Sequence, residues 1–172
     1  MYMKRVTRMI DEADLLVFTS PVHVLHVTGA LKALLDHYGY RFMVHRPEES
    51  MFRKQAVCIT TGAGGGMRST LKDMKSSLRF WGVARIYTYG IAVGAISWEG
   101  VAASVKDKIV GDIDKLSLKL TRETDKVEPS IRTEILFYIM RHMHKKGMNP
   151  VDQEYWREKG WLGKGRPWKK NK

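Results

Sequence analysis

The chain has 172 residues, the length of one domain, and 44% of them are hydrophobic, which is enough to build a buried core. Its 30 lysines and arginines against 18 aspartates and glutamates give a formal net charge of +12, which attracts phosphate-bearing partners. The single cysteine, Cys58, excludes a disulfide within this sequence and fits a cytoplasmic setting, and no apolar run approaches the roughly 20 residues that span a bilayer, so no membrane partner is expected.

The first half of the chain predicts the order helix, strand, helix, strand. Apolar residues at helical spacing indicate an amphipathic helix over 3–13, and the continuous apolar run 15–19 is typical of a strand buried on both faces. The helix expected over 28–39 starts at a threonine suited to capping and ends at a glycine. Residues 40–54 read as a connection, and 56–61 predict the second strand.

The second half continues this alternation. A glycine loop and a helix ending at Gly82 follow the second strand, and a third strand is expected over 84–93. A long helix is predicted over about 101–122 and another from 131 to about 146. The apolar stripe of this last helix is formed by Ile131, Ile135, Ile139 and Met143.

Strands that alternate with covering helices predict an α/β fold with a parallel sheet. Ligands of such sheets bind outside the carboxyl ends of the strands. The loops at 20–27 and 62–67 each follow the carboxyl end of a predicted strand, so we expect these two loops to face one site. We divide the chain into a sheet domain over 1–125, an additional helix over 126–150 and a basic segment over 151–172, whose charges we interpret as solvated.

The glycine loop carries Gly62, Gly64 and Gly66 but matches neither common phosphate-binding motif. It lacks the Lys-Ser/Thr ending of a P-loop, and Met67 stands where GxGxxG requires its last glycine. A flexible turn is the purely structural interpretation. The functional interpretation is close approach of the backbone to a flat ligand, with peptide N–H groups as donors.

Side-chain chemistry in the first loop is weakly indicated. Ser20 lies in no nucleophile elbow and is followed directly by Pro21, which disfavours nucleophilic catalysis. His23 and His26 have no carboxylate or cysteine close in sequence, which disfavours a metal site. We therefore expect neither a catalytic side chain nor a metal.

Three stretches resemble one family, the flavodoxin-like NAD(P)H-dependent FMN reductases with the related iron–sulfur flavoproteins. The family's strand, Ser-Pro-Val-Tyr loop and Gly-x-x-Lys-x-x-x-Asp helix are similar to residues 13–47, which read ADLLVFTSPVHVLHVTGALKALLDHYGYRFMVHRP. FRKQAVCITTGAGGG, at 52–66, resembles the family's next strand and glycine loop, and EYWREKGWLGK, at 154–164, a C-terminal segment of a subgroup. The matching positions of the first motif are Ser20, Pro21, Val22, His23, Gly29, Lys32 and Asp36.

The resemblance implies a flavodoxin-like three-layer sandwich with FMN as cofactor and NAD(P)H as co-substrate. Its two loops would hold the flavin ring, and because hydride chemistry belongs to the flavin, no catalytic side chain is required. A small molecule or a protein would accept the electrons. The implied cofactor-binding residues are Ser20, Pro21, Val22, His23, Thr61, Gly62, Ala63, Gly64, Gly65 and Gly66.

The sequence departs from the family pattern in two ways. His23 replaces the usual tyrosine, and the first two strands with the phosphate-binding loop have no counterpart here. We therefore expect a truncated sheet of three strands, with 15–19 as an exposed edge. Either the chain is the C-terminal part of a longer reading frame, or it is a short protein that completes its sheet through a partner. Cysteines for an iron–sulfur cluster would lie in the absent part.

The alternatives to a flavin oxidoreductase are a flavodoxin-like scaffold that has lost its cofactor and acts by association, and a basic nucleic-acid-binding protein. A nucleic-acid-binding protein would bind single strands through Trp161 and Trp168 of the basic segment, and this alternative is the less favoured. The resemblance also implies a homodimer beside the flavin. Its candidate contacts are the large residues of the connection, Tyr38, Tyr40, Phe42, Met43 and Phe52.

Overall fold

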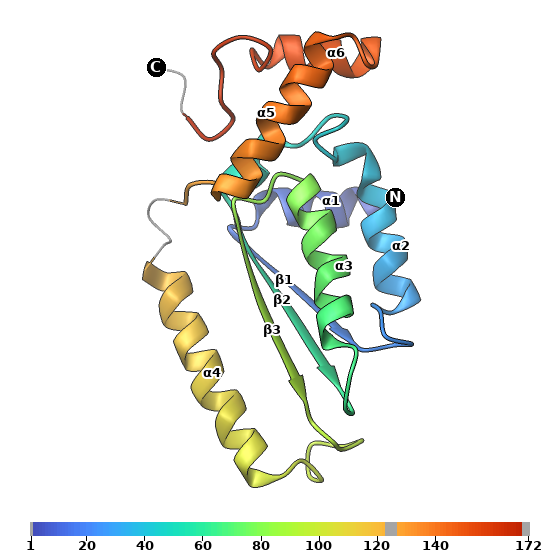
Figure 1. Ribbon diagram of the computed structural model, residues 1–172, viewed down its shortest axis with the longest axis vertical. Helices are drawn as coiled ribbons and strands as arrows, with labels where there is room; N and C mark the ends of the chain where they lie inside the picture. Colours follow the sequence, from blue (N-terminus) through green and yellow to red (C-terminus); the bar gives the residue numbers. More distant parts are fainter. Residues whose placement is uncertain (1, 123–126, 170–172) are drawn as a thin grey trace.

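The computed structural model describes residues 2–122 and 127–169. Figure 1 shows a sheet with helices on both of its faces and two further helices at one end. The helices and strands are α1 (Tyr2–Glu12), β1 (Leu15–Pro21), α2 (Gly29–His37), the 3-10 turns η1 (Tyr38–Arg41) and η2 (Glu49–Arg53), β2 (Gln55–Gly62), α3 (Met67–Phe80), β3 (Arg85–Ala92), α4 (Ala103–Arg122), α5 (Ile131–Lys145) and α6 (Pro150–Glu158). The three strands and the helices α1 to α5 begin and end within a few residues of the predicted bounds, whereas α6 and the two 3-10 turns were not predicted.

The three strands form a parallel sheet in the order β1-β2-β3, which confirms the predicted α/β architecture. Leu15 is level with Gln55, and Gln55 with Arg85, so the carboxyl ends of the strands also lie side by side. In Figure 1, α2 and α3 lie on one face of the sheet and α4 lies on the other. Among the described residues no strand lies beyond β1, so β1 is an edge, as predicted.

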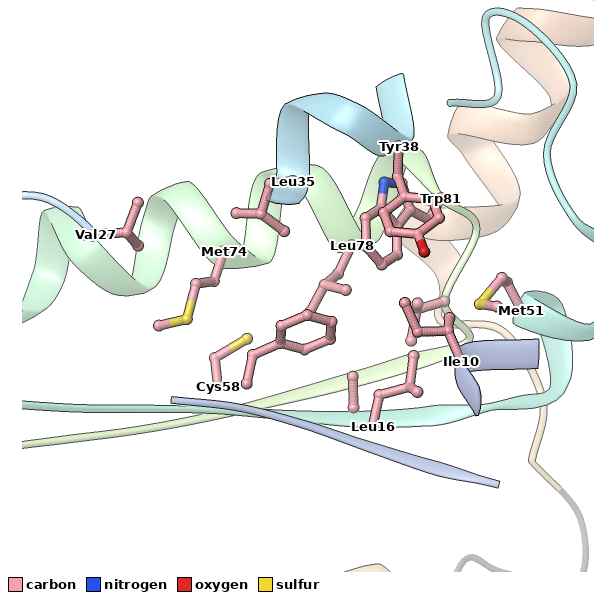
Figure 2. Packing of buried hydrophobic residues seen from close by; sticks show 13 residues of the cluster. Ile10, Leu16, Val27, Leu35, Tyr38, Met51, Cys58, Met74, Leu78 and Trp81 are labelled. Atoms are coloured by element: carbon pink, nitrogen blue, oxygen red, sulfur yellow. The ribbon is translucent and has the colours of Figure 1, made fainter. Parts of the chain in front are cut away.

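The main core lies between the sheet and the helices α1, α2 and α3. In Figure 2, Leu16 and Cys58 point from the strands toward Leu35, Leu78 and Trp81 of the helical layer. Cys58 is fully buried, and burial raises the pKa of its thiol to about 12, so it is an unreactive core residue.

A second core joins the connection before β2 to the C-terminal helices. Met43 and Phe52 pack with Phe137, Trp156 and Trp161, all of them at most 2% exposed. The expected dimer contacts are therefore mostly wrong, because the connection's large side chains, apart from the exposed Tyr40, are buried or half-buried inside this chain. The basic segment packs through Trp156 and Trp161, whereas its charged residues Arg157, Lys164 and Lys169 are exposed, as expected.

The opposite face of the sheet is only partly covered. Leu15 and Val17 of β1 are 40% and 56% exposed, because α4 covers mainly β2 and β3. No described residue of α4 is fully buried. No described helix is long and apolar enough to cross a membrane.

Helix α5 buries a different face from the stripe of isoleucines. Ile131, Ile135 and Ile139 are 77%, 54% and 49% exposed. The buried face carries Phe137, whose ring stacks on Trp156 with centroids 5.0 Å apart, because the second core lies on that side of the helix.

His144 is part of the buried face of α5. Its ring lies 4.5 Å from that of Trp156, and its Nε2 lies 3.3 Å from the carbonyl oxygen of Met43. Burial lowers the pKa of His144, so the ring is held neutral at physiological pH.

Replacing Phe137 with alanine should lower the free energy of unfolding by about 3–5 kcal/mol, because it empties the centre of the second core. The matched variant Ile135→Ala removes a half-exposed side chain from the same helix and should cost less than about 1 kcal/mol. Urea denaturation of both variants measures the difference. Equal losses would mean that α5 does not bury this face.

Candidate functional site

The loops that leave β1 and β2 meet at the carboxyl edge of the sheet. The amide of Val22 donates a hydrogen bond to the carbonyl of Thr61, at 2.8 Å. The amide of Val93, just past β3, donates to the carbonyl of Gly62, at 2.9 Å. All three strand ends are thereby tied together around Gly62, and the two predicted loops are neighbours.

Ser20 closes the first loop from inside. Its side chain is 3% exposed, and its hydroxyl donates to the carbonyl of Pro21 at 2.9 Å and accepts from the amide of Thr28 at 3.1 Å. The hydroxyl is therefore occupied within the protein and positions the loop. It is not free to attack a substrate.

The tip of the first loop is a strained two-residue turn. His23 and His26 exchange backbone hydrogen bonds of 2.9 and 3.0 Å, and the residues between them, Val24 and Leu25, have φ of 47° and 67°. Non-glycine residues rarely adopt such angles, and a β-branched residue especially so. Both apolar side chains are exposed, by 81% and 61%. Strain of this kind concentrates at functional sites.

Helix α3 holds this turn in place. The hydroxyl of Ser69 donates to the carbonyl of Leu25, and Nδ1 of His26 lies 2.8 Å from a carboxylate oxygen of Asp73. His26 thus has a structural role, because its ring anchors the turn to α3. Among the described residues, no three His, Cys, Asp or Glu side chains are grouped so that they could hold a metal ion.

The glycines of the second loop are of two kinds. Gly66 has φ of 84°, and a Cβ on it would lie 2.5 Å from Cγ1 of Val22, so only glycine fits there. A Cβ on Gly62 would lie 3.0 Å from Cγ2 of Val22. Gly64 and Gly65, in contrast, have no protein atom within 4 Å of such a position. The protein's own packing therefore does not require glycine at these two positions.

The tip of the second loop presents unused donors. Ala63, Gly64 and Gly65 are exposed, and their amides make no hydrogen bond to any described residue. Helix α3 begins directly afterwards, and Gly66 at its cap position supplies no side-chain acceptor. These N–H groups can bind carbonyl oxygens or an anionic edge of a ligand.

An apolar cavity of about 380 Å³ lies beside the loops, on the face of the sheet that α4 covers. Its walls include Thr61 and Ile91 from the strand ends and the half-exposed Trp98 from the segment after β3. The phenol of Tyr89 also lines it, with its pKa raised by burial and by the Asp112 carboxylate. Donors at the strand ends beside apolar walls fit a flat ring system with one polar edge.

Comparison with known proteins identifies the family. Residues 1–96, more than half of the chain, match the model of the NADPH-dependent FMN reductases. The chain belongs to this family. An iron-sulfur flavoprotein of Archaeoglobus fulgidus is 27% identical over 172 residues, which cover 93% of this chain and 71% of that protein. The resemblance read from the sequence is thereby confirmed.

Two solved structures share the fold. An apo NADH:FMN oxidoreductase aligns over 74% of this chain with a TM-score of 0.53 and 21% identity. A flavone reductase aligns over 74% with a TM-score of 0.55 and 12% identity. These matches confirm the flavodoxin-like fold class. The chain covers 65% and 49% of those two proteins, less than two thirds of each.

The two kinds of glycine predict unequal effects on stability. Gly66→Ala should lower the free energy of unfolding by about 1–3 kcal/mol, because it adds strain at positive φ and pushes against Val22. Gly64→Ala adds the same methyl group to open space and should change stability by less than about 1 kcal/mol. Thermal denaturation compares them. A Gly66→Ala variant as stable as wild type would contradict the packing of the two loops.

Proposed function

We propose that the chain binds FMN between the loops 20–23 and 61–66 and acts as an NAD(P)H-dependent oxidoreductase, or as the C-terminal part of one. The observation that carries this proposal is that the amides of residues 63–65 have no hydrogen-bond partner among the described residues, in a loop that Gly62 and Gly66 hold against Val22 where parallel strands end. Membership in the FMN reductase family supports the choice of ligand.

The residues of both loops would act by binding and orientation. The amides of Ala63, Gly64 and Gly65 would donate to the polar edge of the flavin ring, and the exposed His23 would place its aromatic ring against it. Donors at that edge stabilise negative charge on the ring and so raise its tendency to accept electrons. When bound, the flavin supplies hydride transfer from NAD(P)H to a small-molecule or protein acceptor, in a cytoplasmic setting.

The experiment is a flavin titration of Gly64→Val, followed by quenching of flavin fluorescence. Because Gly64 has open space around it, the variant should fold normally and yet block close approach of the ring. We expect FMN to bind at least about tenfold more weakly, the effect of losing one good polar contact. Gly39→Val, also in open space but at the far end of α2, is the matched control and should bind like wild type.

The same titration with riboflavin tests whether the ring is the anchor. If the described loops supply most of the binding, FMN and riboflavin should bind with similar affinity. Unchanged FMN binding by Gly64→Val would contradict the site. Failure of wild type to bind either flavin would instead favour the scaffold that acts by association.

We further propose that the chain associates with itself through the edge of β1. The supporting observation is an open parallel strand whose Leu15 and Val17 are 40% and 56% exposed. Sedimentation at low micromolar concentration should show a dimer, and Val17→Lys should convert it to a monomer. Met9→Lys, which replaces a 59% exposed residue of α1, should leave the dimer intact. A wild-type monomer would overturn this proposal.

A further inference from the structure

Helix α3 carries a row of four cations on one face. Arg68, Lys72, Lys75 and Arg79 are separated by four, three and four residues, the spacing that places side chains on the same side of a helix. The row spans roughly 16 Å at about 1.5 Å per residue. All four side chains line one cleft of about 460 Å³ beside β3.

Three other elements bring further cations to this row. A second cleft of about 270 Å³ is lined by Lys75 and Arg79 together with Arg85 of β3, Lys119 of α4 and Arg132 of α5. The two clefts share lining residues and form one depression, which we call the basic groove. Its cations are Arg68, Lys72, Lys75, Arg79, Arg85, Lys119 and Arg132.

The charges of the basic groove are not balanced by the described part of the chain. No described aspartate or glutamate lines either cleft, and none forms an ion pair with the seven cations. The first turn of α5, with Ser130 and Thr133, also borders the narrower cleft and adds the positive end of a helix dipole. Cations held together in this way repel one another, and a bound anion would remove that cost.

Specific contacts in the fold bring the cations of these elements together in the basic groove. The amide of Ser130 donates to the carbonyl of Ala84 at 2.9 Å, and the hydroxyl of Thr133 lies 3.4 Å from the carbonyl of Val83. These bonds hold the start of α5 against the start of β3. Arg132 is consequently placed beside Arg85, although the two are 47 positions apart in the sequence.

We propose that the basic groove binds a small anion with two or more linked phosphate groups. Cations from four elements surround a cleft of about 270 Å³, which suits a compact ligand. A nucleic-acid strand is less suited, because the only aromatic residue among the described lining is the half-buried Tyr87, with Nζ of Lys119 5.2 Å from its ring centroid. Arg85 begins β3 while the glycine loop lies at the carboxyl edge, so the groove is separate from the proposed flavin site.

The test is calorimetric titration of the whole chain with pyrophosphate and with orthophosphate at 0.15 M salt. Pyrophosphate should bind at least about tenfold more tightly, because two phosphates engage more of the cations. The double variant Arg79→Gln, Arg85→Gln should weaken pyrophosphate binding at least about tenfold. The control Lys145→Gln, Lys146→Gln removes the same charge from exposed positions outside the groove and should change affinity less than about twofold.

A third titration identifies the source of the phosphates. Adenosine diphosphate that binds like pyrophosphate would indicate a site for the phosphate chain alone, and tighter binding would indicate a nucleotide. Absence of pyrophosphate binding, or equal losses in the two double variants, would overturn the proposal. It would also be overturned if a single-stranded oligonucleotide bound the groove over a hundredfold more tightly than pyrophosphate. Riboflavin titration of Arg79→Gln, Arg85→Gln should match wild type, which separates this test from that of the flavin site.

Discussion

Val22 packs against Gly62 and Gly66, and this contact sets the position of both loops at the carboxyl edge of the sheet. The strand register brings Pro21 level with Thr61, so Val22, the residue after β1, meets Gly62, the last residue of β2. A side chain on either glycine would push the loops apart. Val22 packs between these glycines, and the amides of residues 63–65 are exposed beside it with no partner in the described chain.

The same loops show where backbone strain is tolerated. Val24 and Leu25 occupy left-handed conformations that would suit an Asn-Gly pair, yet both are apolar and exposed. The cost is offset by the contacts of Ser69 and Asp73, which hold the turn on α3. Helix α3 therefore supports both loops, because it also begins directly after Gly66.

The elements were predictable because their signals are local. Apolar runs, helical spacing and glycine or proline stops located every strand and α-helix of the sheet domain, and the Ser-Pro-Val motif with the glycine loop located the proposed flavin site. The buried face of α5 was not predictable, because this helix has apolar residues on two sides and only the distant Phe52 and Trp156 decide between them. The turn at Val24 and Leu25 carries no turn-forming residue, so nothing in the sequence indicates it.

The sequence alone does not show where the unpaired positive charges of the fold gather. The sequence concentrates basic residues after position 156, but several of them are engaged within the fold. Arg157 pairs with Glu154, Lys159 lies 3.6 Å from Glu49, and the guanidinium of Arg166 lies over the ring of Tyr138. The basic groove is assembled instead from scattered cations without carboxylate partners in the described chain. Attraction of a phosphate depends on unbalanced charges that lie close together. The basic groove should therefore attract phosphates more strongly than the basic segment, although basic residues are concentrated in that segment of the sequence.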